Sequence, residues 1–321
     1  MGMLPAPAPP GQRLLVLGTS EVESVVVTAA LLRATSRPVS TVFTAPADLG
    51  LLAELPAFRQ GRTRTVLLGF PALEVTARPA DVLRALRSAS DLVWVTQHPV
   101  TLPEGEGLTG VRVVSAKGPL WPATAEALDL AVDEMDRLEG LLAELPEALP
   151  EVTEADFDLS WRYALEAARQ DLPALGVVAR RLADLEEPEL DVVGQGRELV
   201  RERRDIAATS GFHVFPIASG RGVMVPVPRS ALGYYLDLAR DARQVRDCDL
   251  CVLAFDSQEP AVIEYAQRPL DLDARMDLLR SSLPDHRICG HGRAGIAIIG
   301  LATGSLELLE TLIGELAKGI H

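Results

Sequence analysis

The chain has 321 residues, of which 48% are hydrophobic but only 4% aromatic, so Ala, Leu and Val must do most of the packing. This is enough apolar material for one large domain or two ordinary ones. The net charge of −14 argues against broad affinity for duplex DNA, because counterion release needs a basic surface. A local basic pocket for a nucleotide stays open.

Residues 1–11 are rich in Pro and Ala and lack the basic-then-apolar build of a signal peptide. No uncharged run is long enough to span a bilayer. The chain has three cysteines, and so low and odd a number is typical of a reducing compartment. We therefore expect a disordered tail, a cytoplasmic protein and no membrane partner.

Cys248 and Cys251 flank the start of a predicted strand and would face opposite ways, which favours core or edge thiols over zinc ligands.

Short apolar runs alternate with helix-like segments in the first third of the chain. Strands are predicted at residues 13–17, 39–43, 65–68, 92–95 and 111–114, and helices at 24–35 and 79–88. Alternation at this spacing predicts an α/β fold, a parallel sheet flanked by helices. We expect this domain to cover residues 12–122.

From residue 123 to 208 the periodicity is helical, and prolines divide the segment into several helices. We expect a helical linker that belongs mainly to the first domain. Its charged run at 197–205 is interpreted as solvated surface, as charge runs usually are.

A second alternating region occupies residues 209–321, where we expect a smaller α/β domain. Its strands are predicted at 213–217, 222–227, 250–254 and 261–265, and its helices at 230–242, 274–282 and 305–317.

Two polar segments follow predicted strands, where parallel sheets bind ligands. The first, residues 18–24, contains Glu21 and Glu23 at the start of a helix, and the alternative is that these acids only stabilise its first turn through the dipole. It lacks the Gly-x-Gly-x-x-Gly pattern of dinucleotide sites. The second, residues 92–99, is a strand that ends in polar residues. Among them His98 could ligate a metal or contact a phosphate, although a lone His at a strand end is more often a hydrogen-bonding residue.

Residues 290–295 read Gly-His-Gly-Arg-Ala-Gly and precede an apolar run at 296–299. Gly290, Gly292 and Gly295 permit close approach of the backbone, and its amides together with His291 and Arg293 would make an anion cradle. We favour an anion-binding loop over a simple glycine-rich turn before a strand.

In this order, the three segments resemble the DHH phosphoesterases with their associated C-terminal domain, which include RecJ-type exonucleases, nanoRNases and cyclic-dinucleotide phosphodiesterases. The resemblance covers the chain from about residue 13 onward. Residues 290–295 are similar to the family's Gly-Gly-Gly-His-x-x-Ala-Gly substrate loop, and Glu21-Val-Glu23 stands at its Asp-x-Asp. Residues 262–268 are similar to a strand that carries a substrate-contacting Arg, which makes Arg268 a further binding candidate.

The chain departs from the family pattern at the metal ligands. Gly69 stands where an Asp is expected, Gln97-His98-Pro99 stands for Asp-His-His, and no His or Asp occurs near residues 17–19. Glu21, Glu23 and His98 remain as metal ligands and residual catalytic positions. A two-metal phosphoesterase needs more anionic ligands than these. We therefore expect Mn or Mg to bind weakly or not at all.

These departures predict a catalytically impaired phosphoesterase-like protein with a regulatory or binding role. Its ligand would be a nucleotide or short oligonucleotide, held in the cleft between the domains. Two alternatives stay open: an active metal-dependent phosphodiesterase that acts on short oligonucleotides or cyclic dinucleotides, and an interaction scaffold without a small ligand. A homodimer or a protein partner also stays open.

Overall fold

A computed structural model describes residues 13–44, 63–70, 82, 86, 91–97, 108, 110–131, 133–143, 145–146, 149–150, 152, 156–169, 171–209, 213–217, 220–226, 235–246, 250–254, 261–265, 288–293 and 296–301. The chain divides into two units, Met1–Glu198 and Leu199–His321. The division falls inside helix α7 (Leu190–Thr209), so this helix contributes residues to both units.

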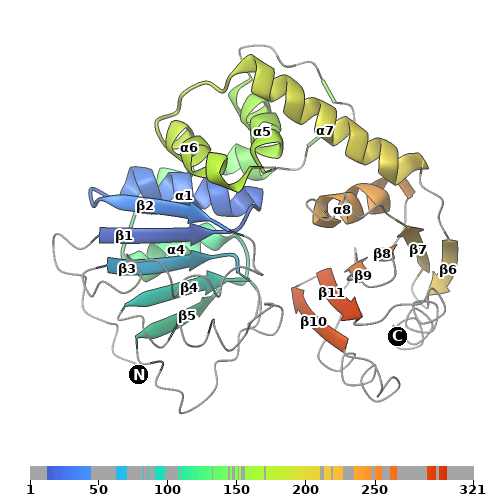
Figure 1. Cartoon of the computed structure of the whole chain (residues 1–321), viewed down its shortest axis with the longest axis horizontal. Helices are drawn as coiled ribbons and strands as arrows, with labels where there is room; N and C mark the ends of the chain where they lie inside the picture. Colours follow the sequence, from blue (N-terminus) through green and yellow to red (C-terminus); the bar gives the residue numbers. More distant parts are fainter. Residues whose placement is uncertain are drawn as a thin grey trace. The chain divides into compact units, whose positions relative to one another are not determined.

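In the described part of the first unit, five strands form a parallel sheet (Figure 1). The strands are β1 (Arg13–Gly18), β2 (Val39–Phe43), β3 (Thr63–Leu68), β4 (Leu92–Thr96) and β5 (Val111–Ser115), in the order β2-β1-β3-β4-β5. All five predicted strands are present, and the predicted α/β fold class is confirmed. Gly18 lies opposite both Phe43 and Leu68, so the carboxyl ends of the strands meet at one edge of the sheet.

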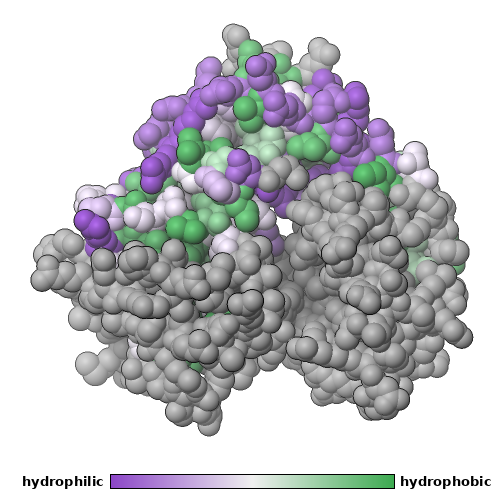
Figure 2. Space-filling model, viewed as in Figure 1, coloured by the Kyte–Doolittle hydropathy of each residue, from purple (hydrophilic) through white to green (hydrophobic). Residues whose placement is uncertain are grey.

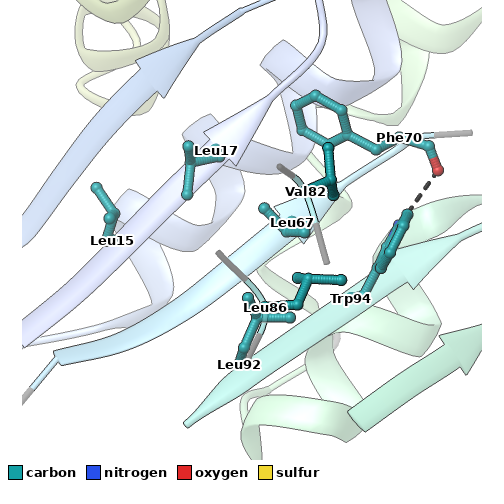
Figure 3. Close-up of a cluster of buried hydrophobic side chains, with 8 residues drawn as sticks. All are labelled: Leu15, Leu17, Leu67, Phe70, Val82, Leu86, Leu92 and Trp94. Atoms are coloured by element: carbon teal, nitrogen blue, oxygen red, sulfur yellow. Dashed lines mark hydrogen bonds between the residues drawn. The ribbon is translucent and has the colours of Figure 1, made fainter. Parts of the chain in front are cut away.

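The central strands β1, β3 and β4 are buried along almost their whole length, which explains their continuous apolar runs, whereas most residues of β2 and β5 are half-buried or exposed. One face carries a cluster that includes Leu17, Leu67 and Trp94 (Figure 3). Val82 and Leu86 complete the cluster in helical conformation; the rest of the helix predicted at 79–88 lies outside the described residues. Fully burying one such side chain stabilises the fold by about 1.5–3 kcal/mol.

Helix α1 (Val22–Ala34) is surrounded by protein, because every residue from 24 to 31 is buried. It contacts β1, α4 (Leu120–Leu128) and α6 (Leu172–Ala183). Such all-round burial requires an apolar helix without a polar face, which is what its sequence provides.

The predicted helical segment consists of α4, the short 3₁₀ helices η3 (Asp133–Met135) and η4 (Glu139–Leu142), α5 (Phe157–Ala168), α6 and the first part of α7. Asp156 caps α5 and Asp171 caps α6, because each carboxylate accepts a hydrogen bond from a backbone N–H three residues later. Hydrophilic residues dominate the visible surface of this segment, with apolar ones scattered among them (Figure 2). Within the described ranges, no helix is both long and apolar enough to cross a membrane.

The second unit contains a mixed sheet, with six strands among its described residues, in the order β10-β11-β9-β8-β7-β6. The strands are β6 (His213–Ile217), β7 (Gly220–Pro226), β8 (Leu250–Ala254), β9 (Ala261–Tyr265), β10 (Ile288–Arg293) and β11 (Ile296–Leu301). Helix α8 (Tyr235–Arg246) packs on β7, β8 and β9 and continues past its predicted end at residue 242. The helices predicted at 274–282 and 305–317 lie outside the described residues.

The interpretation of residues 197–205 as solvated surface is wrong at Arg203. Its side chain is buried, and its Nε donates to Asp241 Oδ2 of α8 at 2.5 Å. Arg204 and Asp237 extend this ion-pair cluster. Burial raises the pKa of the Asp241 carboxyl, while the charge of Arg203 opposes that rise. The sequence could not reveal this role, because the partner lies 38 residues away on another helix.

The backbone of helix α7 at Gly196 packs directly against the backbone of α5 at Tyr163. A Cβ at Gly196 would overlap the carbonyl of Tyr163, whereas nothing lies within 4 Å of a Cβ at Gly194. Arg197 adds a hydrogen bond of 3.0 Å to the carbonyl of Leu149. The absence of a side chain at Gly196 therefore permits this helix contact.

We predict opposite effects of two alanine substitutions in this helix. Gly196→Ala should lower the free energy of unfolding by about 1–3 kcal/mol, because the new methyl group overpacks the contact with α5. The matched control, Gly194→Ala, should raise it by about 0.5–1 kcal/mol, as alanine does in an open helix position. Urea unfolding followed by circular dichroism measures both, and stabilisation by both variants would contradict the contact.

Candidate functional site

The carboxyl edge of the parallel sheet brings several of the predicted site positions together. Glu21 is the N-cap residue of α1 and Glu23 lies in its first turn, directly after β1. Gly69 follows β3 and Gln97 follows β4. Both glutamates are half-buried. His98 and Pro99 lie outside the described residues, so the prediction for His98 stays open.

The carboxylate of Glu23 caps a helix other than its own. Its Oε1 accepts a hydrogen bond of 2.5 Å from the backbone N–H of Leu120, the first residue of α4. The N-cap residue Pro119 makes no side-chain cap of its own. Glu23 therefore supplies the acceptor that the first turn of α4 requires, and its negative charge also suits the helix dipole.

Gln97 is the second hydrogen-bond donor to the Glu23 carboxylate. Its Nε2 donates to Glu23 Oε2 at 3.0 Å and to the carbonyl of Gly118 at 2.8 Å. Both oxygens of the Glu23 carboxylate are thus engaged, one by a backbone amide and one by a side-chain amide. Gln97 fits this arrangement because it is a neutral donor, which an Asp at this position could not be.

Buried hydroxyl groups fill the neighbouring part of the edge. Ser24 Oγ donates to the carbonyl of Leu68 at 3.3 Å and lies 2.9 Å from Thr19 Oγ1. Since a hydroxyl has a single hydrogen, Thr19 must donate to Ser24. The carbonyl of Phe70 accepts from both Trp94 Nε1 and Thr96 Oγ1, the former drawn in Figure 3.

Gly69 cannot carry a side chain without rearrangement. Its φ is +73°, a region that other residues rarely adopt. A Cβ would lie 2.7 Å from Ser24 Oγ and 3.4 Å from Thr19 Oγ1. The hydroxyl pair thus occupies the space that a carboxylate at position 69 would need.

A two-metal centre requires several anionic oxygens and imidazoles around two ions a few Å apart. At this edge Glu23 has both oxygens engaged, Gln97 is neutral and Gly69 has no side chain. Within the part of the chain that the structure describes, no group of three or more His, Cys, Asp or Glu could hold a metal ion. The described residues of this edge therefore do not fit a two-metal centre.

The predicted glycine-rich loop is in large part a β-strand, which corrects that local prediction. Gly290, His291, Gly292 and Arg293 lie in β10, which stands at one end of the described strand order and pairs antiparallel with β11. Closely spaced glycines favour a loop when only local sequence is considered. Here the segment is a strand because it pairs with the apolar strand β11. Gly295 and Arg268 lie outside the described residues. Cys251 is buried, as expected of a core cysteine.

The sequence matches no protein-family model and no curated protein. Solved structures, however, share its architecture. Over 96% of its length the chain is similar to a protein described as a member of a family of ribosomal proteins, with a DHH domain, at 13% identity, 87% coverage of that chain and a TM-score of 0.59. It is also similar to RecJ from Thermus thermophilus, solved in complex with Mn²⁺, over 96% of its length at 14% identity and a TM-score of 0.51.

The chain has the DHH fold. It spans 52% of the RecJ chain, so the likeness concerns one part of that protein. The resemblance inferred from the sequence motifs is confirmed at the level of the fold. At these identities the likeness extends to the architecture and not to the chemistry of the site.

Sequence reasoning did not identify three residues that shape the DHH-fold edge. Thr19 and Ser24 lie inside the segment that it singled out, and their small polar side chains next to a strand end were a signal that could have been used. Arg169, at the C-cap of α5, donates from Nε to the carbonyl of Ser20 at 2.8 Å. No pattern in the sequence links two residues 149 positions apart.

We predict that Glu23 stabilises the fold in the absence of metal. Glu23→Ala should lower the free energy of unfolding by about 1.5–3 kcal/mol, because hydrogen bonds to a charged acceptor are lost and α4 loses its cap. Glu126→Ala removes an exposed glutamate from α4 itself and should change stability by less than about 0.5 kcal/mol. Urea unfolding in EDTA compares the two, and equal effects would contradict the capping role.

Proposed function

We propose that this chain is a catalytically impaired phosphoesterase-like protein that binds a nucleotide or another phosphate-bearing ligand, in a regulatory or binding role. The DHH fold provides the phosphoesterase-like framework. The observation that carries the proposal is the engagement of both Glu23 oxygens by Leu120 and Gln97. These two hydrogen bonds give the Glu23 carboxylate a role in the fold that needs no metal ion.

A metal ion at this edge would have to share Glu23 with existing hydrogen-bond donors. Each oxygen of the carboxylate keeps a lone pair beside the hydrogen bond that it accepts, but an ion that turned the carboxylate would break the bonds from the first N–H of α4 and from Gln97. Unmaking hydrogen bonds at a partly buried site costs about 1–3 kcal/mol for each polar group left unsatisfied. This cost argues against the tuned two-metal geometry that efficient phosphodiester hydrolysis needs.

The ligand would be held mainly by the residues of β10. Glycine in a strand often marks a place where a ligand approaches the backbone closely. Arg293 can offer two parallel donors to a phosphate, and His291 lies two residues before it in β10. Gly290 and Gly292 alternate with them, and Arg268 and Gly295 are the further predicted contacts.

A metal-dependent phosphodiesterase that acts on short oligonucleotides or cyclic dinucleotides is the second candidate function. The RecJ structure with the same fold was solved with Mn²⁺, which favours testing that ion. In this chain Glu21 and His98 would be the remaining ligands besides Glu23.

We predict that hydrolysis is absent or feeble. Purified protein with MnCl₂ should not turn over a diadenylate dinucleotide or cyclic di-AMP at the roughly 1–1,000 s⁻¹ of ordinary enzymes. Product formation followed by chromatography measures this. Robust turnover that disappears in both Glu23→Ala and His98→Ala would establish the phosphodiesterase instead.

We further predict that Arg293 contributes to nucleotide binding. Calorimetry with AMP, with and without MnCl₂, should show binding to the wild-type protein. Arg293→Ala should lower the affinity ten- to a hundred-fold, since a hydrogen bond to a charged group contributes about 1.5–3 kcal/mol and 1.4 kcal/mol is about ten-fold. Arg221→Ala, which removes an exposed arginine from β7 of the same sheet, is the control and should bind as the wild type does. If the wild-type protein binds no nucleotide, the scaffold function replaces this proposal.

A further inference from the structure

The loop between β1 and α1 is held by a residue from the helical segment. Arg169 donates from Nε to the carbonyl of Ser20 at 2.8 Å and from Nη1 to Glu166 Oε2 at 3.2 Å. Ser20 lies between Thr19, whose hydroxyl bonds to Ser24, and the N-cap residue Glu21. The guanidinium therefore fixes the main chain directly before the helix turn that carries Glu23.

Arg169 is itself held in place by buried charge. Its side chain is 8% exposed and that of Glu166 only 5%. Arg162 approaches the other oxygen of Glu166 at 3.9 Å, so the carboxylate lies between two guanidinium groups on one helix. A buried carboxylate requires such partners, and in turn it limits the directions in which Arg169 can point.

We propose that Arg169 is a positioning residue that acts through Glu23: it holds the β1–α1 loop so that the Glu23 carboxylate stays on the first amide of α4. This inference rests on the proposed function, which depends on the hydrogen bonds from Leu120 and Gln97 to Glu23. Arg169 would keep those bonds in place through its contact with Ser20. Residue Arg169 of the helical segment then contributes to the candidate site by holding the β1–α1 loop, without contacting a ligand itself.

The test is hydrogen exchange at the amide of Leu120, measured by NMR on the full chain without ligand or metal. Arg169 bonds to the β1–α1 loop and not to α4, so loosening of the loop reaches this amide through Glu23. Arg169→Ala should speed exchange of the Leu120 amide about ten- to a hundred-fold. The amides of Val93 and Val95 in β4 should keep their wild-type rates.

Two further variants separate positioning from general destabilisation. Arg169→Lys keeps the charge but cannot serve both acceptors in the fork geometry of a guanidinium, so it should give a smaller increase at Leu120. It also replaces the alanine variant if that one fails to fold. Arg180→Ala, which removes an exposed arginine from α6, should leave exchange unchanged.

The double variant decides whether the effect passes through Glu23. Glu23→Ala alone should speed exchange at Leu120, and adding Arg169→Lys should produce no further increase there. Additive effects would overturn the proposal, as would an unchanged Leu120 rate in Arg169→Ala or a uniform increase over the whole first unit. Failure of nucleotide binding would leave these rates as predicted, so the two proposals fail separately.

Discussion

At the carboxyl edge of the parallel sheet, the carboxylate of Glu23 interacts with the N-terminal ends of two helices, α1 and α4. Glu23 lies in the first turn of α1 and accepts from the first amide of α4, so its charge lies near the positive ends of both helix dipoles. Gln97 occupies its second oxygen and joins it to the connection that follows β5. The loops after three strands thereby depend on a single side chain. A cation at Glu23 would compete with the interactions that hold this edge together.

The other residues of the edge are consistent with this single charge. Carboxylates at positions 69 and 97 would place three negative charges close together, and without metal ions their mutual repulsion and desolvation would oppose folding. Glycine at 69 and an amide at 97 avoid that cost. The hydroxyls of Thr19 and Ser24 occupy the space freed at position 69 and satisfy one another and the carbonyl of Leu68. Among the described residues, the edge thus carries two hydrogen-bonded groups, one around Glu23 and one around Ser24.

Strands and their order of appearance could be predicted because local apolar runs determine them: three predicted strands of the second unit, at 213–217, 250–254 and 261–265, coincide with β6, β8 and β9. The family resemblance implied that Glu23, Gly69 and Gln97 share one site, and the parallel topology explains why these positions lie at one edge. What could not be predicted depends on distant partners. Leu120 lies 97 residues from Glu23, and the glycines of residues 290–293 form a strand because β11 pairs with them.

The engagement of Glu23 also bears on how a phosphate could bind without metal. Bare carboxylates repel a phosphate, and this chain already carries a net charge of −14. Two amide donors on the Glu23 carboxylate offset part of its field, as a metal ion would do more strongly. Anion recognition can then rest on a guanidinium and backbone amides, which need no deprotonated ligands and no ion. The proposed loss of metal ligands and the proposed binding of a phosphate are therefore compatible, because the hydrogen bonds to Glu23 also screen the charge of its carboxylate.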